Sequence, residues 1–227
     1  MASDEQIRKH VIEEIRLDPQ LSKIAPQIGI TVKDEVVTLT GTVESYYQKL
    51  AAGKAAHRVK DVKVVAMDIE VRSSGKHGTV NDSEIAEAIR NALTWHSAVN
   101  EDVVNIKVEN GWVYLEGMVD WEYERSAAEK SIEHVRGIKG VINRVKIKQR
   151  DIDSGEVKKK IKAAFQRNAT VDSEGIDVET IGNKVILSGT VRSWTERNDA
   201  EDVVWLMLGV TEVENRLEIE HETYVGE

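Results

Sequence analysis

Alternating apolar and polar positions predict one particular strand three times along the chain. The pattern Val-x-Leu-x-Gly-x-Val begins at three places: Val37, Val113 and Val185. Alternation puts its valines, leucine and glycine on one face of the strand. The glycines of these apolar rows are Gly41, Gly117 and Gly189. A glycine there allows another backbone to come close, and we expect that neighbour to be a helix lying on the sheet.

The matching register extends well beyond this strand. The strand glycines are 76 and 72 residues apart, and the same residue types recur around each of them. Twenty residues after each glycine stands a predicted helix terminator, namely Asp61, Gly137 and Gly209. Hairpin-turn pairs precede each strand at Asp34, Asn110 and Gly182. The chain is therefore three copies of one unit of about 70 residues.

Each copy reads as an α-β-β-α-β unit. An apolar residue at every fourth position, as in Ile7, Val11 and Ile15, predicts an opening amphipathic helix. A hairpin, a second alanine-rich helix and a last strand follow. A right-handed crossover makes the last two strands parallel, so we expect an α+β fold in which each three-stranded mixed sheet carries two helices on one face. We expect the glycine-bearing strand to be the middle strand of each sheet. We expect the three domains to span residues 1–72, 80–149 and 152–221.

Charge and composition exclude several classes of protein. The net charge is −9, and residues 151–227 hold 17 acids and 9 bases, which gives −8. Such a balance disfavours nucleic acid as a partner. The chain has no cysteine and no apolar run long enough to cross a membrane. Its first residues lack the pattern of a signal peptide, so we expect a cytoplasmic protein, or a periplasmic one if a leader was removed.

The titratable residues do not form a recognisable catalytic or metal-binding pattern. None of the 6 histidines pairs with another at the i, i+4 spacing of metal ligands. The glycine and serine motifs of nucleotide-binding proteins and hydrolases do not occur either. We therefore expect no catalytic residue, no metal and no cofactor.

Aromatic residues gather at the predicted starts of the second helices. They are Tyr46, Tyr47, Trp121, Tyr123 and Trp194. Aromatic rings at such places can anchor in a lipid interface or in a partner's pocket. The alternative is that they only hold the helix on its own sheet.

The outer sheet faces, opposite the helices, carry large apolar residues in the second and third units. These are Trp112, Tyr114, Met118 and Ile186. Apolar side chains in a row that should meet water indicate a contact surface. We expect units two and three to use it, either within one chain or in a homo-oligomer.

The strand Leu-x-Gly-x-Val, the later Gly-Val pair and the last strand Val-x-Asn-x-[Leu/Val] together resemble the BON domain, the family named for bacterial OsmY and nodulation proteins. The first unit departs from this pattern at Asp61 and Met67. The resemblance implies a non-enzymatic binding or scaffolding protein linked to osmotic and envelope stress. Its implied ligand is phospholipid or another envelope component. The alternative that the resemblance implies is a potassium-binding sensor, since one BON protein binds that ion.

Overall fold

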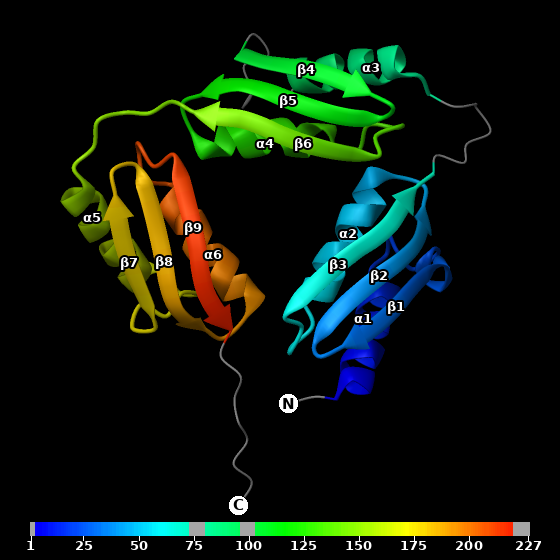
Figure 1. Cartoon of the computed structure of the whole chain (residues 1–227), viewed down its shortest axis with the longest axis horizontal. Helices are drawn as coiled ribbons and strands as arrows, with labels where there is room; N and C mark the ends of the chain where they lie inside the picture. Colours follow the sequence, from blue (N-terminus) through cyan, green and yellow to red (C-terminus); the bar gives the residue numbers. More distant parts are fainter. Residues whose placement is uncertain (1–2, 73–79, 96–102, 220–227) are drawn as a thin grey trace, which may run out of the picture. The chain divides into compact units, whose positions relative to one another are not determined.

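The computed structural model describes residues 3–72, 80–95 and 103–219. Within them the α-β-β-α-β order predicted from the sequence occurs three times, as Figure 1 shows. Each repeat has one three-stranded sheet, and the α+β fold with two helices on one sheet face is confirmed. No helix in these ranges is long and apolar enough to cross a membrane.

The elements of repeat 1 are α1 (Asp4–Leu17), the short 3-10 helix η1 (Ala25–Gln27), β1 (Ile28–Lys33), β2 (Val36–Val43), α2 (Tyr46–His57) and β3 (Val64–Val71). Repeat 2 contains α3 (Asp82–Thr94), β4 (Val104–Glu109), β5 (Trp112–Val119), α4 (Glu122–Ile132) and β6 (Gly140–Ile147). Repeat 3 contains α5 (Ser154–Arg167), β7 (Ile176–Ile181), β8 (Lys184–Val191), α6 (Trp194–Trp205) and β9 (Glu212–Ile219).

The glycine-bearing strand is the middle strand of each sheet, as predicted. The strand orders are β1-β2-β3, β4-β5-β6 and β7-β8-β9. In repeats 1 and 3 the first pair is antiparallel and the second pair is parallel. The registers match as well, because Ile28 pairs with Gly41 and Ile176 pairs with Gly189.

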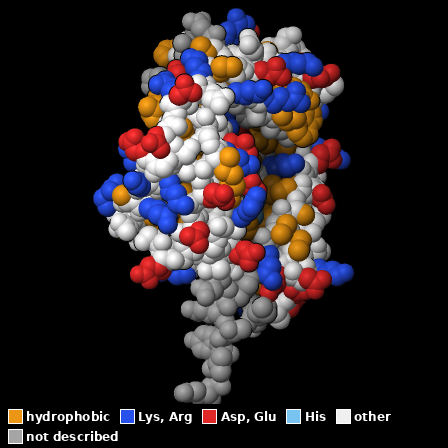
Figure 2. Space-filling view, turned by 60° about the vertical axis from the view of Figure 1, so that its left-hand side comes forward, with side chains coloured by type: hydrophobic (Ala, Val, Ile, Leu, Met, Phe, Trp, Pro, Cys, Tyr) orange, Lys and Arg blue, Asp and Glu red, His pale blue; other side chains and the backbone are white. Residues whose placement is uncertain are grey.

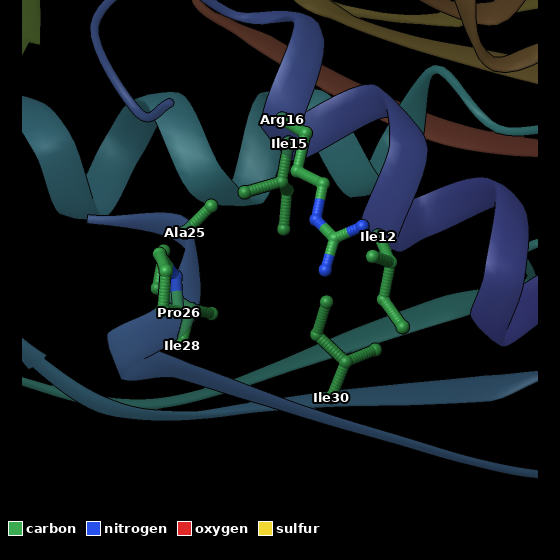
Figure 3. A pocket seen from close by; sticks show the side chains of 7 residues that line it. All are labelled: Ile12, Ile15, Arg16, Ala25, Pro26, Ile28 and Ile30. Atoms are coloured by element: carbon green, nitrogen blue, oxygen red, sulfur yellow. The ribbon is translucent and has the colours of Figure 1, made fainter. Parts of the chain in front are cut away.

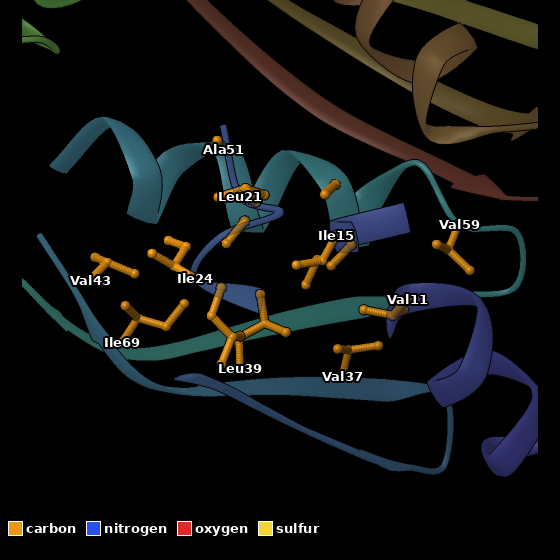
Figure 4. Close-up of a cluster of buried hydrophobic side chains, with 14 of the residues drawn as sticks. Val11, Ile15, Leu21, Ile24, Val37, Leu39, Val43, Ala51, Val59 and Ile69 are labelled. Carbon is orange, nitrogen blue, oxygen red and sulfur yellow. The ribbon is translucent and has the colours of Figure 1, made fainter. Parts of the chain in front are cut away.

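The core of each repeat lies between its sheet and its helices. In repeat 1 the stripe of α1 meets Val37 and Leu39 of β2 from above, with α2 beside it (Figure 4). Alanines of α2 are fully buried there, which brings that helix close to the sheet. Repeat 3 repeats this arrangement with a larger side chain, Phe165 of α5, in its core.

The strand glycine is required, but by a different neighbour than the one predicted from the sequence. The backbone of Gly41 has φ +117, and a Cβ there would collide with the carbonyl oxygen of Gln27. Gly189 has φ +116 and stands in the same way against the carbonyl of Gly175. The prediction that a helix packs on this glycine is therefore wrong for repeats 1 and 3. The close neighbour is the backbone that enters the first strand.

The predicted turn and terminator residues adopt the left-handed conformation that their positions demand. Asp34 and Glu35 have φ of 51° and 63°, as a tight hairpin turn requires. After the second helix, Asp61, Gly137 and Gly209 have φ of 69°, 92° and 87°. Asp61 is the one non-glycine of these three and holds a conformation that costs it free energy.

The caps of the second helices differ in detail from a full capping box. Ser45 and Ser193 do accept bonds from the amides of Gln48 and Glu196. The return bond, however, reaches one residue further back, since Glu44 N donates to Gln48 Oε1 at 3.0 Å. In the first helices, by contrast, the full capping box forms at Ser3 and at Asn81.

Candidate functional site

The five aromatic residues predicted as a binding site all lie at the starts of the second helices, but their exposure differs. Tyr123 of α4 is 58% exposed, and its ring stacks with that of Trp121 at a centroid distance of 6.5 Å. Tyr46 is buried. Tyr47, Trp121 and Trp194 are partly exposed. Repeat 2 therefore offers the most accessible aromatic pair.

Two arginines beside these aromatic residues, Arg197 and Arg125, form hydrogen bonds or ion pairs within the protein. Arg197 lies over the Trp194 ring at 5.2 Å and donates to the carbonyl oxygens of Asn215 and Leu217. Arg125 forms a 2.6 Å ion pair with Glu122. Arg197 thus links α6 to β9, and Arg125 pairs with a carboxylate of its own helix, so both cations are engaged inside the protein.

A buried carboxylate stabilises the start of α6. Glu196 is 3% exposed and accepts hydrogen bonds from the amides of Asp172 and Arg192 at 2.7 and 2.8 Å. Burial favours its neutral form, but the bonds from the Arg192 side chain and from the two amides outweigh burial and lower its pKa. The carboxylate is fully used in local structure, so its perturbed pKa does not indicate catalysis.

A polar contact ties the second helix to the last strand in repeats 2 and 3. Asn143 donates to Glu129 at 3.3 Å, and Asn215 donates to Glu201 at 2.9 Å. In repeat 1 the matching residues are Met67 and Gly53, and the Met67 sulfur lies 3.0 Å from where a Cβ at position 53 would stand. The departure of repeat 1 at Met67 is therefore one half of a replaced pair.

The four residues predicted as an interface lie on the outer sheet faces, with unequal exposure. Trp112 is 42% and Met118 is 52% exposed, and the Trp112 ring lies against Gly140. Tyr114 is held between Lys107 and Arg144, at 5.5 and 5.3 Å from its ring centre.

Ile186 is only 7% exposed, and its strand neighbours across the sheet are Glu179 and Glu214. Ile186 therefore contributes little exposed apolar surface to the predicted interface. The exposed part of that interface lies in repeat 2, at Trp112 and Met118.

Comparison with known proteins assigns the chain to a family. The model of the BON domain matches residues 3–73, 81–149 and 153–221. The chain belongs to the BON family. It is 30% identical over 148 residues to "Osmotically-inducible protein Y" of Escherichia coli (strain K12), covering 61% of this chain and 72% of that protein.

Two further likenesses are more limited. The "Uncharacterized protein in gshII 5'region" of Anaplasma centrale is 30% identical over 128 residues, which is 55% of this chain and 84% of that protein. A solved structure of CdsD, a structural protein of the type III secretion system of Chlamydia trachomatis, aligns over 94% of this BON chain and 93% of its own. Its identity is 14% and its TM-score is 0.27, which supports no inference.

BON repeat 1 contains a pocket of about 190 Å³ between α1 and the start of its sheet. Figure 3 shows isoleucines, Ala25 and Pro26 around it, with the Arg16 side chain extending between Ile12 and Ile30. One cation beside an apolar wall suits a small anionic group with a short hydrocarbon part.

Repeat 3 has an exposed apolar surface that the sequence analysis missed. Ile181, Leu206 and Leu208 are 58%, 71% and 46% exposed. They stand at the β7–β8 turn and in the loop after α6. Comparing the three BON repeats position by position would have found them, because repeats 1 and 2 carry polar or charged residues at the same places.

Among the described residues, no group of three or more His, Asp or Glu side chains could hold a metal ion. Backbone carbonyls can hold potassium without any such side chains, so the potassium alternative stays a prediction. On the face seen in Figure 2, Lys and Arg are interspersed with Asp and Glu, which is unlike the clustered cations of a nucleic-acid interface.

Proposed function

We propose that this BON protein is a non-enzymatic, osmotic-stress-associated protein that binds phospholipid or another envelope component. The observation that carries the proposal is the accessible aromatic pair, Trp121 and Tyr123, at the start of α4. Trp and Tyr rings combine an apolar body with a polar edge, which suits the boundary between lipid and water. The likeness to "Osmotically-inducible protein Y" supports the link to osmotic stress.

The local chemistry favours contact through rings over capture of a phosphate by a cation. Arg197 and Arg125 are engaged by carbonyls and by a carboxylate within their own repeats. Arg192, at the start of α6, is likewise paired with the buried Glu196. We therefore expect binding to depend on apolar burial and to respond weakly to salt.

Co-sedimentation of the full chain with vesicles tests this function. One set of vesicles contains phosphatidylcholine alone, and the other includes phosphatidylglycerol. We expect Trp121→Ala with Tyr123→Ala to lower partitioning by about tenfold or more for each ring removed, since burying one aromatic side chain is worth roughly 1.5–3 kcal/mol. Trp112→Ala is the control, because it removes an exposed aromatic from a sheet face. A folded wild type that binds neither vesicle would rule out the lipid function.

A further inference from the structure

Three exposed aliphatic residues of repeat 3 lie at one end of that repeat. We call Ile181, Leu206 and Leu208 the hydrophobic tip. The β7–β8 turn and the loop after α6 are joined there, because Asn183 Nδ2 donates to the carbonyl of Gly209 at 2.6 Å and Thr211 N donates to Asn183 O at 2.9 Å. Figure 1 shows both segments at this end of repeat 3.

The tip replaces charged and polar residues of the other repeats. The position of Leu206 is Arg58 in repeat 1 and His134 in repeat 2. Leu208 corresponds to Lys60 and Arg136, and Ile181 corresponds to Lys33 and Glu109. The fold therefore does not require apolar side chains at these three places. Because they are exposed in repeat 3, burial in its own core does not explain them either.

Several backbone amides of the tip loop are hydrogen-bonded within the protein. The amides of Leu206 and Met207 donate to Val204 O, and Val210 N donates to Met207 O at 3.3 Å. Gly209 holds the loop at φ +87 against Ile152, where a Cβ would not fit. Backbone groups bonded within the protein enter a lipid phase at much lower cost than free ones.

We propose that the hydrophobic tip inserts into the headgroup interface of a zwitterionic lipid membrane, an inference that rests on the lipid-binding function proposed above. A membrane accepts projecting aliphatic side chains without a matching groove. Repeat 3 also selects the kind of lipid, because residues 151–227 hold 17 acids and 9 bases and are repelled by an anionic surface.

Exchanging the tip leucines for the residues of repeat 1 tests the proposal. The full chain with Leu206→Arg and Leu208→Lys carries side chains that the same fold already accommodates at Arg58 and Lys60. We expect its partitioning onto phosphatidylcholine vesicles to fall by about tenfold per leucine. Leu17→Lys, at an exposed leucine of repeat 1 that belongs to no proposed contact surface, should leave partitioning unchanged.

A site-specific probe gives an independent readout, because the chain has no cysteine of its own. A polarity-sensitive dye on Leu208→Cys should shift its emission to the blue when phosphatidylcholine vesicles are added. The same dye on Leu17→Cys, at the exposed leucine of repeat 1, should not respond. Vesicles containing phosphatidylglycerol should give a smaller shift at position 208, and added salt should restore part of it.

The outcomes separate this inference from the proposed function. If the wild type binds vesicles and the tip variant binds equally well, the tip proposal is overturned while lipid binding stands. If the wild type binds no vesicle, the lipid function itself fails, and the tip proposal with it. A dye at position 208 that is already blue-shifted without lipid, or a wild-type oligomer that the tip variant dissolves, would show that protein covers the tip and would overturn membrane insertion.

Discussion

Repeats 1 and 3 share a backbone but hold the second helix to the last strand by different chemistry. In repeat 3 Asn215 bonds to Glu201 and to the carbonyl of Arg197. Repeat 1 has Met67 against Gly53 at the corresponding places. Repeat 3 has an amide hydrogen-bonded to a carboxylate where repeat 1 has a thioether packed on a helix glycine. Partly buried polar groups need partners, so the two residues have to differ together.

The two repeats also differ at the ends of their sheets. Repeat 1 presents Arg58 and Lys60 to water where repeat 3 presents Leu206 and Leu208. These exchanges leave the hairpin, the helix terminator and the strand register in place. Positions constrained by the backbone are therefore shared between the two repeats, whereas exposed positions differ in chemistry.

The largest expected effect comes from replacing the strand glycine that repeats 1 and 3 share. Gly41→Val and Gly189→Val should each destabilise their own repeat by about 3 kcal/mol or more, because a side chain there meets a carbonyl at a φ that L residues avoid. Hydrogen exchange of β1–β2 and β7–β8 amides would measure each repeat separately.

Thr190→Val is the matched control for the glycine variants and should change stability by less than about 1 kcal/mol, since Thr190 is exposed. Normal exchange protection in either glycine variant would contradict the carbonyl explanation.

A double-mutant cycle sharpens the difference between the helix-to-strand contacts. Met67→Asn in repeat 1 should cost about 1–3 kcal/mol, because its amide has no carboxylate to meet at Gly53. Adding Gly53→Glu should recover part of that loss by recreating the pair found in repeat 3.

The reverse cycle, Asn215→Met with Glu201→Gly, serves as the counterpart in repeat 3. Chemical denaturation followed by amide exchange in each repeat measures the coupling. Strictly additive effects in both cycles would show that the paired residues are independent.

Low pH should destabilise repeat 3 more than repeat 1. The pKa of the buried Glu196 in repeat 3 is lowered. Surface ion pairs lower carboxyl pKa values in both repeats, that of Glu214 to about 2 in repeat 3 and those of Glu5 and Glu70 in repeat 1, so the difference between the repeats rests on Glu196. A lowered folded-state pKa contributes stability above the ordinary carboxyl pKa, and that contribution is lost as pH falls through the folded value.

Repeat 3 should therefore lose exchange protection between about pH 4.5 and pH 2 before repeat 1, which has the neutral Gln48 at the position of Glu196. Glu196→Gln should reduce this acid sensitivity, and Glu174→Gln, at an exposed residue, is the control. Equal acid profiles for the two repeats would contradict this account.

The smallest effect concerns the outer face of repeat 2. We expect the wild-type chain to self-associate through Trp112 and its neighbours, and Trp112→Lys to reduce that association. Sedimentation velocity over a range of concentrations measures both proteins. A wild type that stays monomeric at every concentration would remove the homo-oligomer from consideration.

The sequence by itself determined the repeat, the order of elements and the central strand. These features follow from local rules, because apolar periodicity assigns helices and strands, and turn residues such as Asp34 need a left-handed backbone. The positions of the aromatic residues at the helix starts could be predicted for the same reason. Spacing along the chain is sufficient wherever the partner is a few residues away.

Only the tertiary structure decided which neighbour each side chain meets. It placed a carbonyl, not a helix, against Gly41, buried Tyr46 and Ile186, and left Leu206 exposed. It also joined the β7–β8 turn to the loop after α6 through Asn183. These outcomes depend on contacts between residues distant in sequence, and apolar periodicity carries no information about the partner across the fold.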